Sequence, residues 1–320
     1  LTLVEGGVKA VFEINPHFAD ALSVAEAPKG YTVMGNELKA TPGTEKNPYG
    51  VRAMGQLSAI NWNSENRNTK TVLHGHSNTD KTTNSSQFPY LSRVGAATKR
   101  YWKQTHDIDG ANGTYTPIAE YYDRINGQGP KTSSLFGWFG GEYDGDDYVI
   151  QDVKIQGQTS SCAGLFGMIY NGRLDSVILY STDGTGTVEA KRDERTLTCW
   201  YAAGTLVGMA VTDDKNSNGL VNCSVAGYTV NANVYTSSGW GGSCIGGLAG
   251  VSNMALEGCS AVTEVKVPST AVDNDNMRVG GLVGSCQNSV TNCYAGGSID
   301  IESGVTVPGG KNPPKGVYVG

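Results

Sequence analysis

Apolar and polar positions along this chain follow a repeating pattern that is centred on glycine. A core of glycine, leucine, any residue and glycine occurs at Gly164–Gly167, Gly247–Gly250 and Gly281–Gly284, with a degenerate copy at Thr205–Gly208. The copies begin at residues 164, 205, 247 and 281, so the intervals are 41, 42 and 34 residues. A period of this length predicts a solenoid in which each repeat stacks on the next.

A short strand-like segment lies beside each core and places a small apolar residue directly after a turn-forming residue. This shared position is occupied by Val153, Val177, Cys223, Cys259 and Cys293. Such strands bury their apolar sides and satisfy their hydrogen bonds only when they stack in register on their neighbours. The pattern therefore predicts an all-β protein with the fold of a right-handed parallel β-helix.

The seven cysteines are an odd number and include no CxxC pair, so their spacing does not indicate a zinc site. We expect Cys223, Cys259 and Cys293 to form an inward ladder of small buried hydrophobic side chains. Disulfides between them are the alternative, which the orientation of neighbouring strands disfavours.

The segments outside the repeat also carry predictions. Polar insertions at 181–195, 212–219 and 270–277 account for the long intervals, and we expect them to project as loops. Residues 57–62 are expected to form a short helix that caps the N-terminal end of the β-helix, where strand edges would otherwise be exposed. Residues 1–44 are expected to form a small N-terminal β segment, with a strand from residue 8 and a hairpin over 31–40.

At this point the sequence resembles a known family. Val279–Gly284 followed by Val290–Ala295 is similar to the repeat of the GLUG-motif family, named for Gly-Leu-any-Gly, and Phe139–Ile155 resembles the entry segment of that family. The resemblance covers about residues 45–320 and implies an extracellular β-helix of bacterial surface proteins without a conserved catalytic site. Val317–Gly320 stands where another core would follow, so we expect that the natural chain continues, leaving the β-helix incomplete at this end, or that the end docks onto a partner.

The amino-acid composition and net charge limit the classes of partner that the chain could bind. The chain carries 44 glycines, a charged fraction of 17% and a net charge of −6. An acidic chain without a basic stripe is unsuited to nucleic acid, whose phosphates require clustered Lys and Arg. No apolar run reaches the roughly 18 residues of a membrane span.

Candidate metal sites are few. Asp214, Asn216 and Asn218, followed by Gly219, match the opening of a calcium loop. Val225 stands at the twelfth position, where such a loop has Glu, so a polar turn is the competing interpretation. We therefore predict no cofactor, with calcium at this loop as the alternative. His74 and His76 would share one face of a strand and form a second candidate metal site, although the surrounding Asn78, Thr79 and Asp80 suit an exposed loop better.

Two other features bear on carbohydrates. Asp152 and Asp175 lie near turns of adjacent repeats, where a β-helix glycosidase or lyase would place paired carboxylates. Turn aspartates that cap backbone donors explain both residues without chemistry, and this is the interpretation that we favour. Aromatic residues also cluster, and exposed rings stack on sugars whereas buried rings pack the corners of a β-helix. The clusters are Tyr101-Trp102, Tyr121-Tyr122, Trp138-Phe139 with Tyr143, Trp200-Tyr201 and Trp240.

Together these observations predict a non-catalytic stalk, spacer or adhesin of an extracellular bacterial surface protein. The expected partner is a host or bacterial surface glycan or protein. The first alternative is a carbohydrate-binding or carbohydrate-cleaving β-helix. The second is a subunit of an extracellular filament that self-associates through an open β-helix end.

Overall fold

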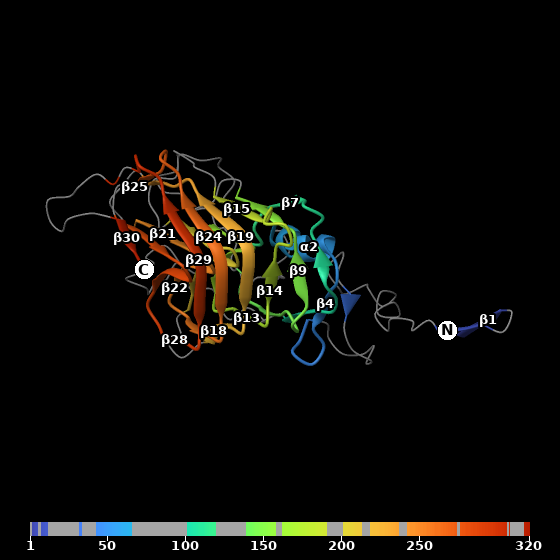
Figure 1. Ribbon diagram of the computed structural model, residues 1–320. Coiled ribbons are helices and arrows are strands. Elements are labelled where there is room, and N and C mark those ends of the chain that lie inside the picture. The colour runs from blue at the N-terminus through green and yellow to red at the C-terminus, as the bar shows by residue number, and fades with distance from the viewer. Residues whose placement is uncertain are drawn as a thin grey trace.

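The computed structural model describes residues 2–5, 8–11, 32–33, 43–65, 101–119, 139–157, 162–190, 201–212, 218–236, 242–273, 276–305, 307 and 317–320. Over these residues the protein is nearly all-β, with one helix and with most strands in parallel sheets (Figure 1). Four sheets account for the repeating part, and the repeats that begin at residues 142, 173, 218 and 255 each contribute strands to all four in the same order.

The strands are grouped by sheet as follows. The first sheet contains β3 Thr32–Val33, β4 Tyr49–Val51, β5 Tyr101–Gln104, β8 Glu142–Asp144, β13 Arg173–Asp175, β18 Asn218–Val221, β23 Ala255–Glu257 and β28 Val290–Thr291. The second sheet contains β6 Ile108–Asp109, β7 Thr114–Tyr115, β9 Val149–Gln151, β10 Lys154–Gln156, β14 Ile178–Tyr180, β15 Thr187–Ala190, β19 Ser224–Ala232, β24 Ser260–Val267 and β29 Tyr294–Ile301. The third sheet contains β11 Cys162–Ala163, β16 Tyr201–Ala203, β21 Ser243–Gly246, β26 Met277–Gly280 and β30 Val317–Val319. The fourth sheet contains β12 Phe166–Tyr170, β17 Val207–Val211, β22 Ala249–Ser252 and β27 Val283–Cys286.

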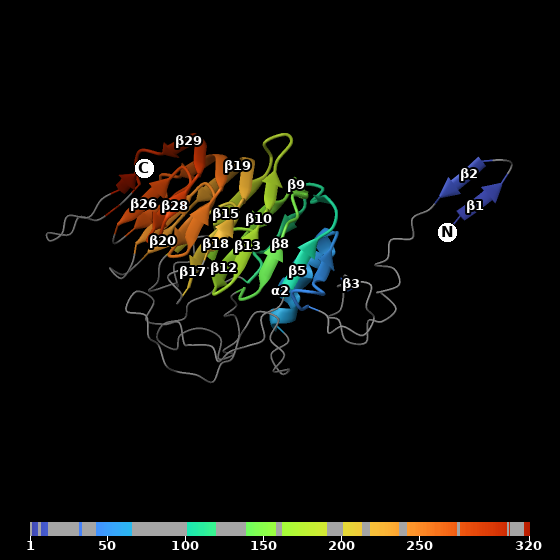
Figure 2. The same ribbon diagram turned by 90° about the horizontal axis from the view of Figure 1, so that it is seen from below.

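Successive repeats pair in parallel and in register. The longest pairing joins β24 to β29 over eight residues, from Ser260 opposite Tyr294 to Val267 opposite Ile301. The offset between these partners equals the 34-residue spacing of the last two glycine cores. Figure 2 shows the strands of each sheet running side by side along the molecule. The period read from the sequence is therefore the period of strand pairing.

The packing of the sheets explains why glycine and leucine recur in the glycine core. Its leucine points inward, so that Leu165, Leu206 and Leu248 are all buried in the main hydrophobic core. Its last glycine lies where the third and fourth sheets approach each other most closely. A Cβ on Gly250 would lie 2.5 Å from the amide nitrogen of Ala203 and 2.7 Å from the carbonyl oxygen of Gly208. Because these are backbone atoms of the preceding repeat, only glycine fits without moving a strand.

A left-handed residue precedes each inward small residue at the corner between the first and second sheets. These residues are Ser176, Asn222, Gly258 and Asn292, with φ between 50° and 63°. Asp147, with φ 60°, has the same place before the exposed Tyr148. Asn, Asp and Gly tolerate this conformation best, which explains the turn-forming residues seen in the sequence. The predicted ladder of Val177, Cys223, Cys259 and Cys293 is confirmed by the strand register.

One member of the predicted ladder was wrong. Val149 pairs with Ile178, so Tyr148, and not Val153, is the register equivalent of Val177. The chain has two more residues between Asp144 and Tyr148 than between Asp175 and Val177, which shifts the frame. Val153 instead lies after the next corner and immediately before β10.

The interior is continuous along the repeats. At the N-terminal end, a chain of aromatic contacts runs through it, with Trp102 to Phe139 at 5.3 Å between ring centroids and Phe139 to Phe166 at 5.0 Å. Further along, aliphatic side chains and the cysteines take over. A second apolar cluster packs on the other face of the third and fourth sheets, and includes Met168, Met209 and Val251. The fourth sheet is thus apolar on both faces.

One predicted segment differs in the structure, and a second is described only in part. The polar insertion 181–195 was expected to be a loop, but it contains β15, which pairs with both β10 and β19. In the N-terminal part, β3 pairs antiparallel with β4, and the rest of the predicted hairpin, residues 34–40, lies outside the described residues. A separate antiparallel hairpin joins β1 Thr2–Glu5 to β2 Val8–Val11. The domain boundary at residue 44 stays a prediction.

The helix and one small sheet complete the described residues. Helix α2, Met54–Glu65, includes residues 57–62, and its Leu57 and Ile60 are buried in the main core. Strands β20 Tyr235–Thr236 and β25 Val272–Asp273 form a short parallel pair.

The last repeat is less covered than the others. Leu282 and Ile299 are only partly buried, whereas their equivalents Leu248 and Val265 are fully buried. A cavity of about 500 Å³ opens between them and is lined by backbone and side chains of β27 and β29 and by Gly320.

Candidate functional site

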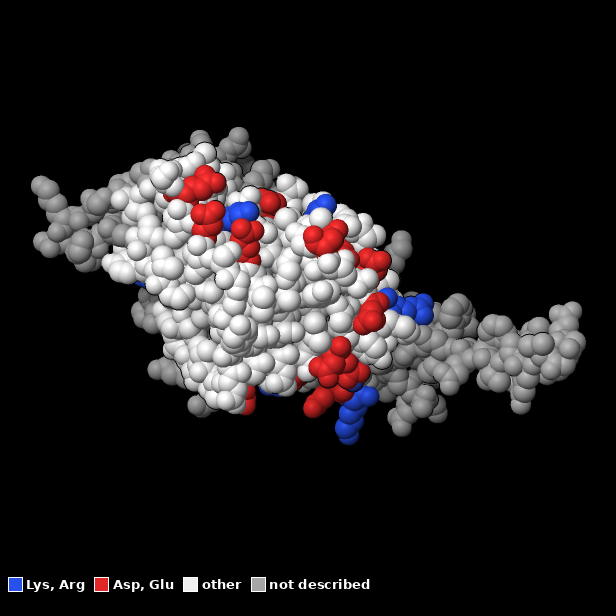
Figure 3. All heavy atoms as spheres, in the orientation of Figure 1, with Lys and Arg blue, Asp and Glu red and all other residues white. Residues whose placement is uncertain are grey.

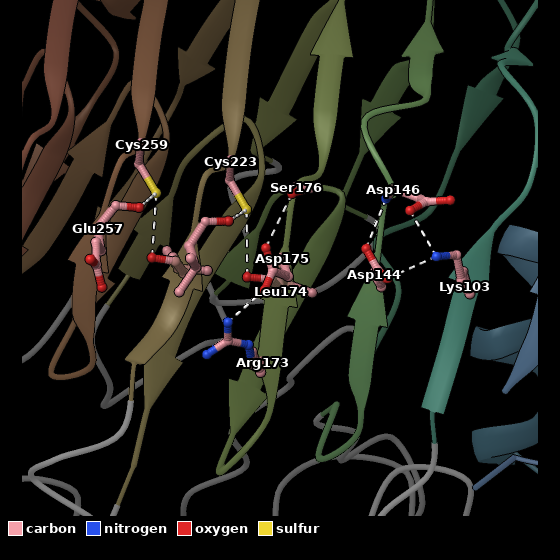
Figure 4. A network of polar contacts seen from close by, with 12 residues as sticks. Lys103, Asp144, Asp146, Arg173, Leu174, Asp175, Ser176, Cys223, Glu257 and Cys259 are labelled. Carbon is pink, nitrogen blue, oxygen red and sulfur yellow. Dashed lines mark hydrogen bonds and ion pairs between the residues drawn. The ribbon is translucent and has the colours of Figure 1, made fainter. Parts of the chain in front are cut away.

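The outer face of the first sheet carries a strip of charged side chains that are brought together by strand register. Lys103, Asp144 and Asp175 occupy one row on β5, β8 and β13, because Lys103 is opposite Asp144 and Asp144 is opposite Asp175. Glu142 and Arg173 occupy the neighbouring row, two residues earlier on the same strands. Side chains two residues apart on a strand share a face, so all five lie on the outer face. This set is called the charged strip below. Figure 4 shows four of them, Lys103, Asp144, Arg173 and Asp175.

Lys103 binds two carboxylates at one end of the strip. Its Nζ lies 2.7 Å from Asp146 Oδ1 and 3.5 Å from Asp144 Oδ2. Partial burial acts to lower the pKa of Lys103, but the hydrogen bond to Asp146 and the charges of both carboxylates outweigh it and raise that pKa above 10.5. Asp144 also accepts a hydrogen bond from the amide of Asp146 at 2.9 Å. Lys103 therefore stays cationic and ties the Asp146–Asp147 turn to the sheet.

Arg173 and Asp175 form the second ion pair, within a single strand. The other oxygen of Asp175 accepts a hydrogen bond from Ser176 Oγ at 3.2 Å. Both oxygens of this carboxylate are thus engaged by the chain itself. In Figure 4 the two ion pairs lie beside each other across β5, β8 and β13.

The spacing of the strip bears on catalysis. Neighbouring strands lie about 4.8 Å apart, and retaining glycosidases hold their two carboxyl groups about 5–5.5 Å apart. Asp144 and Asp175 are register partners, so their backbones lie about one strand spacing apart. Each of them is already occupied by a cation and by a hydrogen bond from a neighbouring residue, so a substrate would have to displace these contacts.

The predicted pair of Asp152 and Asp175 is not brought together, which corrects that expectation. Asp152 lies at the corner after β9, whereas Asp175 ends β13 and is opposite Asp144. The Asp152 carboxylate is buried and accepts hydrogen bonds from Thr182, at 2.8 Å from its amide and at 2.9 Å from its hydroxyl. Asp152 thus caps the backbone of the next repeat.

The predicted metal sites fall mostly outside the described residues. This holds for Asp214, Asn216, His74 and His76; Asn218 begins β18, but its side chain is outside the description. Among the residues that the structure describes, no group of three or more His, Cys, Asp or Glu side chains is placed to hold a metal ion. The calcium loop therefore stays a prediction.

The aromatic side chains divide sharply. Of the predicted clusters, Trp102, Phe139, Tyr143 and Tyr201 are buried, as corner packing requires. Others of those clusters, Tyr121, Tyr122, Trp138, Trp200 and Trp240, lie outside the described residues. The exposed tyrosines are different ones, which the sequence reasoning missed: Tyr148, Tyr180, Tyr294 and Tyr318. Alternation along the strands would have found Tyr180 and Tyr294, because each directly follows an inward position, Leu179 or Cys293.

The fold and this geometry define a nearly all-β protein of stacked parallel sheets. Comparison with protein families identifies one similarity in sequence. Residues 275–300 match the family described as the GLUG motif, which confirms the resemblance over the last complete core and the strands around it. No curated protein matches the chain.

One solved structure covers most of the chain at low similarity. It comes from Bacteroides ovatus and is described, provisionally, as an immunoglobulin A1 protease. The identity is 16%, the TM-score is 0.32, and the match covers 87% of this chain and 84% of that one. Within the described residues, no helix is long and apolar enough to cross a membrane.

Proposed function

We propose that this chain is a right-handed parallel β-helix that serves as a non-catalytic structural or adhesive module, a stalk, spacer or adhesin, of an extracellular bacterial surface protein. The observation that carries the proposal is the parallel pairing of equivalent strands from repeat to repeat in four sheets, with register shifts only within β18–β23 and β19–β24 among the described pairings between repeats. A stack whose every layer hydrogen-bonds to the next along its length is stiff, which is what a stalk or a display scaffold requires.

Helix α2 supports the β-helix interpretation at the N-terminal end. Its Leu57 and Ile60 are buried in the same core as Tyr49 and Val51 of β4. The burial of these two side chains in the same core is compatible with the role of a cap. Such a cap also disfavours the filament alternative, because head-to-tail stacking through strand edges would need both ends open.

The contacts of the acidic residues favour a structural role over catalysis. Asp152 caps the backbone at Thr182, and Asp107 accepts a hydrogen bond from the amide of Val149 at 2.8 Å. Asp144 and Asp175 are held in ion pairs on an outward face. Each carboxylate therefore has a role in holding adjacent strands or turns together.

The thiols are compatible with an extracellular location. None of the six cysteines that the structure describes is in a disulfide, and Cys223 and Cys259 are buried. Extracellular proteins ordinarily use disulfides, but a buried, protonated thiol is protected from oxidants. The location itself rests on what the GLUG resemblance implies.

A turnover assay tests the non-catalytic part of the proposal. The purified chain would be incubated with neutral and anionic polysaccharides and with a peptide library, and new reducing ends, unsaturated sugar ends and peptide termini would be measured. We expect no product above that of a heat-denatured control. Product formation that disappears in Asp175→Asn, and not in the outward control Glu257→Gln, would refute the proposal in favour of a carbohydrate-cleaving enzyme.

A further inference from the structure

The outer face of the second sheet carries a surface without charge. Two rows of outward side chains cross five parallel strands, β9, β14, β19, β24 and β29. On the first four of these strands the residues between the two rows, Ile150, Leu179, Val225 and Ala261, point into the core and are buried. The face consists of Val149, Gln151, Ile178, Tyr180, Ser224, Ala226, Ser260, Val262, Tyr294 and Gly296. We call it the neutral face.

The boundaries of the neutral face are charged. On β6 the same two rows continue with Asp107 and Asp109. At the other boundary, the later residues of the long strands β24 and β29 include Glu264, Lys266 and Asp300. Figure 3 shows this arrangement, with a broad uncharged area in the middle and acidic groups around it. A ligand that lies on this area meets no counter-charge, which selects against a charged ligand.

Large apolar side chains are exposed on this face. Tyr180 and Val262 are each 44% exposed and Tyr294 is 63% exposed. Tyr294 reaches along its own strand over Gly296, because a Cβ on Gly296 would lie 2.9 Å from the tyrosine Oη and 3.2 Å from its Cε1. The missing side chain of Gly296 therefore makes room for the ring against the sheet, and the ring remains largely open to solvent.

We propose that the neutral face is a binding site for an uncharged polysaccharide. Tyrosine rings stack on the apolar faces of sugar rings, and Ser224, Ser260 and Gln151 provide hydroxyl and amide groups for the sugar hydroxyls. Tyr180 and Tyr294 are three strands apart, about 14 Å, and the outward side chains between them are those of serine, alanine and valine. The ligand is therefore an extended chain that lies across the strands and contacts both tyrosines.

This inference deepens the adhesive side of the proposed function and rests on it. A protein partner would also use exposed tyrosine and valine. The flat and evenly spaced array, with hydroxyls between two distant rings, suits a repeating polymer better than the irregular surface of a folded protein.

The test is affinity electrophoresis of the whole chain in gels that contain a neutral glucan, mannan or xylan, with polygalacturonate as the anionic comparison. We expect retardation by at least one neutral polymer. Tyr180→Ala and Tyr294→Ala should each weaken it about three- to tenfold. Gly296→Val should weaken it similarly by displacing the Tyr294 ring. Tyr318→Ala is the matched control, because Tyr318 is 54% exposed but belongs to the third sheet.

Several results would refute the proposal of a polysaccharide-binding site. Absence of retardation by every neutral polymer, retardation by polygalacturonate alone, or an equal loss in Tyr318→Ala would overturn the assignment. Concentration-dependent self-association that Tyr180→Ala and Tyr294→Ala abolish would assign the face to a second copy instead. Thermal unfolding of each variant controls for misfolding. None of these outcomes alters the turnover assay, so the site and the non-catalytic role fail separately.

Discussion

Replacing Gly250 by alanine is the most informative single change to the packing. Its new Cβ would lie 2.5 Å from the Ala203 nitrogen, 2.7 Å from the Gly208 oxygen and 2.8 Å from the Cys244 oxygen. All three are backbone atoms, so no side-chain rotation relieves the contact. Inserting a methyl group into a well-packed interior costs about 1–3 kcal/mol, and here we expect a loss near 3 kcal/mol in the free energy of unfolding.

Two other glycines provide matched controls for this change. Gly55 lies in α2 with no atom near its Cβ position, so Gly55→Ala should stabilise by about 0.5–1 kcal/mol through helix propensity. Gly281 begins the last glycine core, and its Cβ would meet only the Ala295 side chain at 3.2 Å. Gly281→Ala should therefore cost much less than Gly250→Ala, although both positions belong to the same motif.

Urea unfolding followed by circular dichroism would measure all three variants. We expect the order Gly55→Ala above wild type, Gly281→Ala slightly below it, and Gly250→Ala lowest, with a melting temperature several degrees lower. A free energy of unfolding for Gly250→Ala within about 0.5 kcal/mol of the wild-type value would contradict the close backbone contacts that we describe around Gly250.

Three further predictions follow from buried polar groups. Asp152→Ala leaves the Thr182 amide and hydroxyl without their acceptor and should lower the free energy of unfolding in urea by about 1–3 kcal/mol. Asp152→Asn should retain part of that stability. Equal stability of the wild type and both variants would contradict the capping role. Burial raises the pKa of Tyr228 from 10.0 to about 12. The folded state then holds this proton where the unfolded state has lost it, so stability should fall as pH rises from about 10 to 12; a Tyr228→Phe protein with the same pH dependence would refute this cause. Burial also raises the pKa of the Cys223 thiol, so Cys223 should not react with a thiol reagent at pH 8 until the protein unfolds, as mass mapping of the labelled residue would show.

The repeat itself could be predicted from the sequence because stacking requires equivalent residues at equivalent positions. The spacing of Cys223, Cys259 and Cys293 predicted their register correctly. The prediction failed for Val153, where two extra residues around the Asp146–Asp147 turn shift the frame. Both Asp residues have positive φ, at 50° and 60°, a conformation that sequence alone does not assign to aspartate.

Features decided by distant pairing could not be predicted. Thr187–Ala190 lies in a polar stretch and becomes a strand because β10 and β19 both pair with it. The charged strip joins Lys103, Asp144 and Asp175, which are far apart in sequence and share a row only after the register is set. The same reason hid the neutral face, since exposure depends on which face each residue occupies.

Distances along the neutral face test the stacked arrangement most directly. Spin labels attached through cysteines would replace Gln151 together with Tyr180, Val262 or Gly296, which lie one, three and four strands away in the same row. We expect backbone separations from Gln151 of about 5 Å to Tyr180, 14 Å to Val262 and 19 Å to Gly296, because each repeat adds one strand spacing. Separations that do not increase in that order, or that exceed these values by more than the length of the labels, would contradict the in-register stacking on which the proposed β-helix depends.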